Sequence, residues 1–252
     1  MTAQAQLRWT SAARTDIGLV RSRNEDALLE MGERGVWAVA DGMGGHAYGD
    51  VASGMVVEAL QALADPGDID RFAAAAGDQL RAVNRRLRDE AVLRKVAMMG
   101  STVVVLLASG SEAAYVWAGD SRIYLYRNGR LRQLTRDHSQ AEEYRAHPPG
   151  LDAPPAMPNQ ITRALGAADT IDYEVGTLQV RDGDLFLLCS DGLSNPVEDQ
   201  AIAEMLAAGD CRRAVDELVA QALANGGRDN ISVVVVRADD ASSDKTMINP
   251  AL

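Results

Sequence analysis

Five aspartates stand at the ends of apolar segments or beside glycine, and their positions suggest metal chemistry. They lie in RNEDA, WAVADGMGGH, AYVWAGDSR, LFLLCSDGL and GGRDNISVVVV, as Asp26, Asp41, Asp120, Asp191 and Asp229. Each adjoins a segment that has the composition of a buried strand. Converging carboxylates repel one another unless cations hold them, and carboxylate oxygens suit Mg²⁺ or Mn²⁺. The sequence therefore predicts a multi-metal site on a β scaffold.

Glycine follows two of these aspartates, Asp41 and Asp191. A glycine lets the backbone approach a cation closely, so the carbonyl of Gly42 is a candidate ligand. Asp229 follows two glycines and precedes another apolar run. Taken singly, each aspartate is also compatible with an ordinary turn. The strand-end context that they share is what favours a metal site.

Two arginines precede the first acidic pair, which is Glu25 and Asp26. On a strand, Arg21, Arg23 and Glu25 would share one face and Asp26 would lie on the other. An arginine beside metal-binding acids suits a phosphate that is held while metals activate water. The alternative is an exposed strand with ion pairs, which is common and contributes little stability.

Other catalytic motifs are not matched. The segment CSDG, which begins at Cys189, lacks the nucleophile elbow, and DGMGGHAYG lacks the Lys-Ser/Thr ending of a P-loop. The two cysteines form neither a disulfide framework nor a zinc motif. His138 in TRDHS could act as an acid or a base. A lone histidine at a strand end more often satisfies local hydrogen bonds, and we favour that interpretation.

The charge of the chain argues against nucleic acid as a partner. The formal net charge is -11, and phosphate backbones require basic surfaces. The N-terminus has no apolar signal core, and no run approaches the roughly 20 apolar residues that span a membrane. We therefore expect a soluble cytoplasmic protein that does not bind membranes.

The predicted strands fall into two groups separated by helices. One or two strands are expected within 7–20, and further strands at 35–41, 101–108, 113–120, 122–127, 173–180, 184–191 and 230–238. Asn128-Gly129 predicts a two-residue hairpin turn. Apolar residues at helical spacing predict four helices, at 50–64, 69–95, 197–208 and 211–227.

This order differs from the alternation of a doubly wound sheet. It predicts an α+β fold, an αββα four-layer sandwich in which two mostly antiparallel sheets are flanked by helix pairs. We expect one domain over residues 1–240 and a flexible tail at 241–252. Five of the eight prolines fall within 139–160, which predicts a surface loop there.

Together these motifs resemble the metal-dependent protein serine/threonine phosphatases of the protein phosphatase 2C-like (PPM) family, in its bacterial form. The similarity extends from roughly Thr15 to Ala238. It comprises, in the family's order, GLVRSRNEDA, VADGMGGHAYGDVAS, GST, WAGDSRIYLYRNGRL, LTRDHS, ITRALG, LLCSDGL and GGRDNISVVVV. One such motif alone would be weak evidence, whereas eight in order are specific.

The resemblance implies a metal centre at one end of the two sheets. It implies that Asp41 bridges two Mn²⁺ or Mg²⁺ ions, that Gly42 contributes its carbonyl, and that Asp191 and Asp229 ligate the first ion. A hydroxide between the ions would attack phosphorus in line, without a covalent enzyme intermediate.

The resemblance also assigns the remaining charged residues. Glu25 and Asp26 would lie by the second ion, partly through water. Asp120, together with Asp191, matches the position that holds a third ion in bacterial members. Arg21 matches the arginine that grips the substrate phosphate.

Two departures from the family pattern concern proton transfer and the flap. Some eukaryotic members have a histidine, proposed as general acid, two residues after the bridging aspartate. Here that residue is Met43, and His46 follows three residues later, so the general acid is unassigned. The flap, at about 139–161, is short and rich in proline, where many bacterial relatives have a longer, helical flap.

The resemblance implies an enzyme that dephosphorylates phosphoserine and phosphothreonine in proteins and opposes a bacterial Ser/Thr kinase. We expect it to be a monomer. Control of type VI secretion is one pathway in which such pairs occur. A non-catalytic relative would have lost its aspartates, and a phosphatase of anti-anti-sigma proteins would carry sensor domains. Thr246 in the tail, if phosphorylated, could bind a forkhead-associated domain; the alternative is an inert tail.

Overall fold

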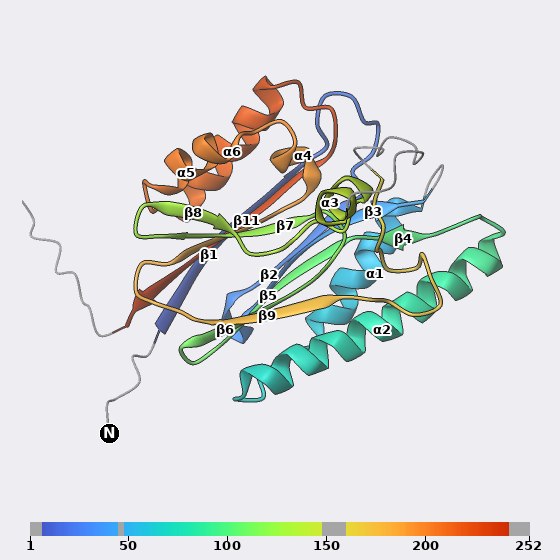
Figure 1. Ribbon diagram of the computed structural model, residues 1–252, viewed down its shortest axis with the longest axis horizontal. Helices are drawn as coiled ribbons and strands as arrows, with labels where there is room; N and C mark the ends of the chain where they lie inside the picture. The colour runs from blue at the N-terminus through green and yellow to red at the C-terminus, as the bar shows by residue number, and fades with distance from the viewer. Residues whose placement is uncertain (1–6, 45–47, 148–159, 242–252) are drawn as a thin grey trace, which may run out of the picture.

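Two antiparallel sheets form the centre of the protein (Figure 1). The computed structural model describes residues 7–44, 48–147 and 160–241. Sheet A contains, in spatial order, β1 (Leu7–Asp16), β11 (Ile231–Asp240), β10 (Leu185–Cys189), β7 (Arg122–Arg127) and β8 (Arg130–Gln133). Sheet B contains β2 (Asp26–Met31), β3 (Val36–Met43), β5 (Val103–Ser109), β6 (Glu112–Ala118) and β9 (Glu174–Gln179), with β4 (Gly100–Ser101) pairing with β3.

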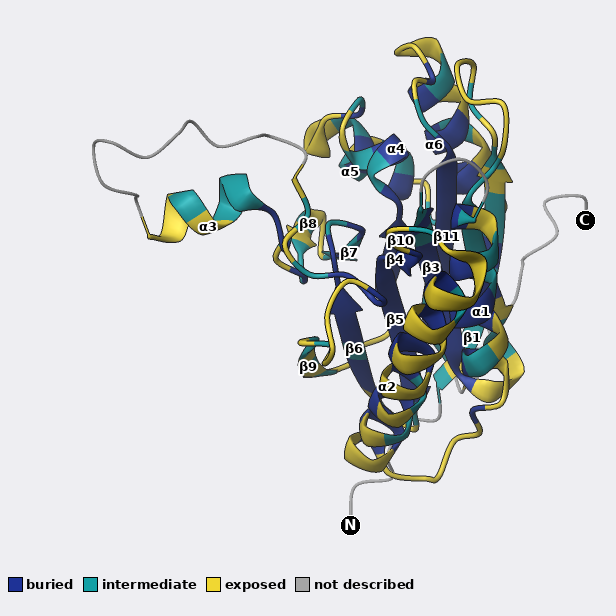
Figure 2. Cartoon of the chain, turned by 90° about the vertical axis from the view of Figure 1, so that its right-hand side faces the viewer, coloured by how far each residue is buried: buried dark blue, intermediate teal, exposed yellow. Residues whose placement is uncertain are grey.

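Helices cover the outer face of each sheet. The helices are α1 (Gly49–Gln61), α2 (Ile69–Arg94), α3 (Gln140–Ala146), α4 (Asp191–Ser194), α5 (Asp199–Leu206) and α6 (Cys211–Ala224), and a 3-10 turn forms at Gly32–Arg34. The first two pack on sheet B, whereas α4, α5 and α6 pack on sheet A. Helix α3 contains no buried residue and stands away from the sheets (Figure 2). The predicted αββα sandwich is therefore confirmed.

The core has three layers because both faces of the central strands are covered. Along β3, Val36, Ala38 and Ala40 face α1 and α2, whereas Trp37 and Val39 face sheet A. Strands β5 and β11 divide their side chains between two layers in the same way. A strand buried on both faces reads as a continuous apolar run, which explains why these segments do not alternate with polar residues.

The long helix α2 matches the predicted amphipathic segment. It begins at the cap residue Asp68, whose carboxylate accepts the backbone N–H of Arg71 at 2.9 Å. Burial of Phe72 and Leu80 fixes its inner face, and the helix ends at Lys95 in a left-handed conformation with φ 58°. No helix in the described part of the chain is long and apolar enough to cross a bilayer.

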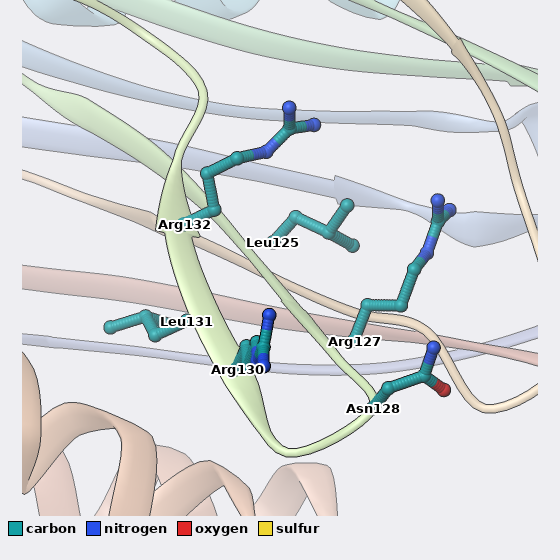
Figure 3. Close-up of a pocket in the computed structure, with 6 residues that line it drawn as sticks. All are labelled: Leu125, Arg127, Asn128, Arg130, Leu131 and Arg132. Atoms are coloured by element: carbon teal, nitrogen blue, oxygen red, sulfur yellow. The ribbon is translucent and has the colours of Figure 1, made fainter.

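The predicted hairpin turn is confirmed. Asn128 and Gly129 have φ of 52° and 75°, as the mirror-image turns that match strand twist require. The hairpin ends at β8, the edge strand of sheet A. Arg127, Arg130 and Arg132 line a hollow of about 700 Å³ beside it (Figure 3). Arg130 and Arg132 lie on this edge strand, where charged side chains prevent pairing with other chains, which accounts for them without a ligand. Arg127 lies on β7 and is ion-paired with Asp184.

Two predictions of local structure are wrong. Part of the expected surface loop at 139–160 is helix α3, because the side chain of Ser139 caps its first turn by accepting the N–H of Glu142. Residues 17–25 form no strand, and β2 begins only at Asp26, so the shared face expected of the two arginines and Glu25 does not exist. Residues 148–159, His46 and Thr246 lie outside the described residues.

Candidate metal centre

Strand register brings the five predicted aspartates to one end of the two sheets. Asp26 and Asp41 face each other across the β2–β3 pair. Asp120 follows β6, which is antiparallel to β5, and Asp191 starts α4 directly beyond β10. Asp229 lies just before β11, the antiparallel partner of β10. Figure 1 shows the end of β3 and the start of α4 at this same end.

The electrostatics of Asp41 show how closely the five carboxylates gather. Its pKa is raised well above the ordinary value of 3.8, first because the side chain is buried. The further causes are the charges of Asp26, Asp191, Asp120 and Asp229, in that order. The charges of all four other predicted aspartates therefore raise the pKa of Asp41, the residue that the resemblance places between the ions.

Three of these carboxylates have an unsatisfied oxygen. Within the described residues, one buried oxygen, Oδ1, has no hydrogen-bond partner in Asp26, in Asp120 and in Asp191. Burial is also the main reason that their pKa values rise, to about 6 for Asp26 and Asp191 and about 7 for Asp120. Buried polar atoms are normally paired, so these oxygens fit a site for hard cations.

The ligand set is open rather than a closed cage. No three acidic, histidine or cysteine side chains within the described ranges lie close enough together to enclose an ion. Mutual repulsion of carboxylates agrees with that spacing. Mg²⁺ commonly keeps several waters and uses only one or two carboxylates, so an open set suits such an ion.

Neighbouring side chains fix the orientation of two carboxylates. The Ser190 hydroxyl donates to Oδ2 of Asp26 at 2.8 Å. The Asn195 side chain donates to Oδ2 of Asp191 at 3.1 Å, one helical turn further along the chain. In both carboxylates the second oxygen is thereby held in place while the first, Oδ1, stays unpaired. Sequence reasoning missed both supporting residues, because a serine after a strand and an asparagine after a short helix carry no distinctive signal.

Asp41 is held through its backbone. Its N–H donates to Oγ1 of Thr102 at 3.0 Å, and that hydroxyl pairs with the Ser121 hydroxyl at 2.7 Å. This explains the threonine of the GST motif, which links the two strand ends that carry Asp41 and Asp120.

Packing requires the glycines that follow Asp41 and Asp191. A Cβ on Gly42 would lie 1.9 Å from the carbonyl oxygen of Gly49, and a Cβ on Gly192 would lie 1.9 Å from that of Asn230. Backbone atoms cannot yield as a flexible side chain can, so any larger residue would displace the aspartate before it.

Arg21 lies beside the carboxylates on an exposed loop. Its Nη2 donates to Oδ2 of Asp229 at 2.7 Å, while 52% of its side chain remains exposed. It can therefore reach both the centre and a ligand that arrives from solvent. The loop that carries it is the segment 17–25.

Asn230 holds this loop at both ends and was not predicted as a site residue. Its Nδ2 donates to the carbonyls of Ile17 and Arg23, each at 2.9 Å, and its Oδ1 accepts the N–H of Glu25 at 2.8 Å. The side chain is buried and all three bonds are made within the fold. Its only signal in the sequence is its place directly after Asp229.

Glu25 takes part mainly through its backbone. Its carbonyl accepts the N–H of Gly42 at 3.0 Å and the hydroxyl of Ser53 at 2.6 Å. Its side chain lies against Gly49 at the start of α1. A position at the side of the centre, as the resemblance implies, is compatible with this arrangement.

His138 is engaged in hydrogen bonds, as favoured from the sequence. Its Nδ1 accepts the N–H of Gly119 at 3.1 Å, and its Nε2 lies 3.1 Å from Oε1 of Glu174. Burial is the main reason that its pKa is lowered, so the ring is neutral near pH 7. The histidine therefore supports the turn that precedes Asp120. Met43 ends β3 and, as a thioether, has no proton to donate.

Comparison with known proteins identifies the family to which this chain belongs. The model of the protein phosphatase 2C family matches residues 20–231. The serine/threonine protein phosphatase PstP of Mycobacterium tuberculosis is 38% identical over 255 residues, which cover 96% of this chain. The same stretch covers 47% of PstP, so this chain spans about half the length of that relative.

Solved structures agree in fold. PppA of Pseudomonas aeruginosa, a key regulatory component of the type VI secretion system, superimposes with a TM-score of 0.84 at 42% identity, covering 91% of this chain and 97% of PppA. The catalytic domain of PstP in complex with two manganese ions gives a TM-score of 0.80 at 36% identity, covering 93% of this chain and 100% of that domain. The chain therefore belongs to the protein phosphatase 2C family of metal-dependent serine/threonine protein phosphatases.

Proposed function

We propose that this chain hydrolyses phosphoserine and phosphothreonine in proteins, using Mn²⁺ or Mg²⁺. The observation that carries the proposal is the set of three buried, unpaired carboxylate oxygens beside a half-exposed arginine. The carboxylates suit hard cations, and the arginine suits a phosphate dianion. Family membership supports the same reaction.

The proposal assigns two ions to the core of the centre. Asp41 would contact both, Asp191 and Asp229 would hold one, and Asp26 would hold the other, with Glu25 nearby. The Gly42 carbonyl would complete the set. The central place given to Asp41 is supported by the charges of the other four aspartates, all of which raise its pKa.

Asp120 would hold a third ion together with Asp191. The supporting observations are that Oδ1 is buried and unpaired in both residues, and that the charge of Asp191 is the second-largest cause of the raised pKa of Asp120. A cavity of about 110 Å³ lies between these two aspartates and helix α3.

Bound cations would supply an activated water and would neutralise charge on the transferred phosphoryl group. The chain itself orients the substrate. Arg21 would exchange part of its ion pair with Asp229 for the phosphate oxygens and stabilise the charge that develops on them. Met43 has no proton to donate, and both ring nitrogens of His138 are engaged in hydrogen bonds. We therefore propose that water protonates the leaving serine or threonine.

The substrates would be phosphoproteins made by a bacterial Ser/Thr kinase. The similarity to PppA favours type VI secretion as the pathway. A phosphorylated Thr246 that binds a forkhead-associated domain stays a prediction, since that residue lies outside the described ranges.

Metal-dependent hydrolysis tests the proposal directly. We expect the purified chain to hydrolyse p-nitrophenyl phosphate and a phosphothreonine peptide with MnCl₂, and to lose at least about 100-fold in rate when EDTA replaces the metal, since the ions supply several kcal/mol. Released phosphate is measured for both substrates. Folded protein that shows no turnover with Mn²⁺ or Mg²⁺ would contradict the proposal.

The raised pKa values predict how pH affects metal binding. Between pH 3.8 and about 6 to 7, the native state of the metal-free protein keeps protons on Asp26, Asp120 and Asp191 that the unfolded chain has lost. The contribution of these protons to the stability of the native state is fully present below the ordinary pKa of 3.8 and is lost as pH rises through about 6 to 7. Manganese must displace these protons, so its binding strengthens as pH rises.

We therefore expect the increase in Tm caused by excess MnCl₂ to be larger at pH 8 than at pH 5.5. Thermal unfolding with MnCl₂ and with EDTA, at both pH values, measures this increment. An increment that is the same at both pH values would show that the metal does not compete with protons at these aspartates.

A further inference from the structure

A second cavity adjoins the metal centre on the side of α4 and the turn between α6 and β11. Its volume is about 520 Å³. It shares Asp191 and Asp229 with the centre and extends to Asn195, Pro196, Asn225 and Arg228. A molecule whose phosphate is held at the two aspartates would therefore have its neighbouring groups in or next to this cavity.

Backbone hydrogen bonds join the turn that carries Arg228 to its neighbours on two sides. It contains Gly226 and Gly227 in left-handed conformations, with φ of 118° and 49°. The Gly227 N–H donates to the carbonyl of Ala222 at 3.1 Å, and its carbonyl accepts the N–H of Leu19 at 2.7 Å. The turn is thus joined both to α6 and to the loop that carries Arg21. Arg228 follows directly after these two glycines.

Arg228 is the cation of this cavity and is available to a ligand. Its side chain is exposed, and among the described residues it has no hydrogen-bond or ion-pair partner. Each of the two asparagine amides in the lining already donates one hydrogen bond within the fold. The Asn225 amide donates to the carbonyl of Pro196 at 2.6 Å, and the Asn195 amide donates to Asp191 at 3.1 Å.

We propose that Arg228 binds a second anionic group of the substrate, a carboxylate or a phosphate that flanks the phosphoresidue. This inference rests on the proposed function. Arg228 directly precedes Asp229, and adjacent Cα atoms are about 3.8 Å apart. An extended peptide rises about 3.4 Å per residue. The group that Arg228 contacts therefore lies one or two residues from the phosphoserine or phosphothreonine.

Arg228 and Arg21 divide the recognition between them. Arg21 is paired with Asp229 at the centre, whereas Arg228 faces the neighbouring cavity. Metal ions at the aspartates would offset their negative charge, so that an anionic flank would meet a local positive charge on a chain whose formal net charge is -11. An arginine can hold either a carboxylate or a phosphate with two parallel hydrogen bonds.

The test compares three phosphothreonine peptides with the Mn²⁺-loaded protein. One has glutamate at the first and second positions on each side of the phosphothreonine, one has glutamine at these positions, and one has a non-hydrolysable phosphonate analogue of phosphoserine at these positions. The variants are R228Q, R228K and the control R212Q. Arg212 is exposed at the opposite end of α6, so R212Q makes the same change in net charge away from the cavity.

We expect the ratio of kcat/KM for the glutamate peptide to that for the glutamine peptide to fall about fivefold in R228Q, the effect of one exposed charge-assisted contact. R228K should retain part of the ratio, R212Q should leave it unchanged, and about 0.5 M NaCl should reduce the difference through screening. The same ratio is measured for the phosphonate peptide relative to the glutamine peptide. A larger fall of that ratio in R228Q would identify a second phosphate as the preferred group, whereas equal falls would show that Arg228 binds a carboxylate and a phosphate equally.

Two results would overturn the inference. If R228Q changes kcat/KM for all peptides and for p-nitrophenyl phosphate by the same factor, Arg228 does not bind the anionic group that flanks the phosphoresidue. If R228Q and R212Q change the ratio equally, only the overall charge matters. Wild-type protein that hydrolyses none of the substrates would instead refute the proposed function, which separates the two failures.

Discussion

Asp191→Asn is expected to abolish Mn²⁺-dependent turnover while making the metal-free protein more stable. The loss of activity should reach at least about 10³-fold, because Asp191 contributes to two of the three proposed metal positions, one in the core and the third. The stabilisation has a separate cause. The pKa of Asp191 is raised from 3.8 to about 6, chiefly by burial and then by the charge of Asp229. Above pH 7, Asp191 is therefore ionised in the native state, and this buried charge lowers the stability of the metal-free protein.

Asparagine removes that charge and can still accept the hydrogen bond from Asn195. At about 1.4 kcal/mol per pKa unit, the gain is at most about 3 kcal/mol, which raises Tm by several degrees in a chain of this size. Thermal unfolding at pH 8 in EDTA measures the gain, and MnCl₂ should add less to Tm in the variant than in the wild type.

Asp199→Asn is the matched control for this variant. Asp199 is an exposed residue at the start of α5 and undergoes the same change in charge. It should keep wild-type turnover and the full effect of MnCl₂ on Tm. An Asp191→Asn protein that retains Mn²⁺-dependent turnover would show that Asp191 is not a ligand. A variant with a lower metal-free Tm would show that the carboxylate is favourably bound in the native state.

The sequence predicted those site residues whose charged side chains adjoin an apolar segment. A carboxylate at the end of an apolar strand is costly without a partner, and that conflict identified Asp41 and Asp191. Strand register then brings them together with the other aspartates, because antiparallel partners present their ends at the same side of a sheet. The three buried layers likewise follow from continuous apolar runs such as VVVLLA, which only a strand covered on both faces allows.

The loop that carries Arg21 could not be predicted in this way. Arg21, Arg23 and Glu25 alternate as they would on a strand, yet the backbone is fixed by a residue that is 205 to 213 positions distant along the chain. No residue within the segment itself indicates this distant contact. The helix α3 was missed for a different reason. The prolines at 148–158 indicate a loop, although Ser139 followed by Glu142 is a helix-start pattern.

Asn230→Ala is expected to reduce both stability and activity, because Asn230 is the distant residue that fixes this loop. The substitution leaves the carbonyls of Ile17 and Arg23 and the N–H of Glu25 without their partner. Loss of three hydrogen bonds from a buried side chain costs about 2–4 kcal/mol. Release of the loop would also displace Arg21, and a shift of about 1 Å in a positioning group can cost 10²-fold in kcat/KM.

Asn84→Ala separates these two effects. Asn84 is also a buried asparagine with three bonds, since its amide donates to the carbonyls of Ala168 and Asp169 and its oxygen accepts the N–H of Gly166. It lies on α2, and in the described part of the chain none of its three hydrogen bonds reaches a predicted site residue. The two variants should lose similar amounts of Tm, yet only Asn230→Ala should lose about 10²-fold in kcat/KM for a phosphothreonine peptide at a temperature well below both transitions. Equal losses of activity would mean that Asn230 contributes only stability, and that Arg21 keeps its position without it.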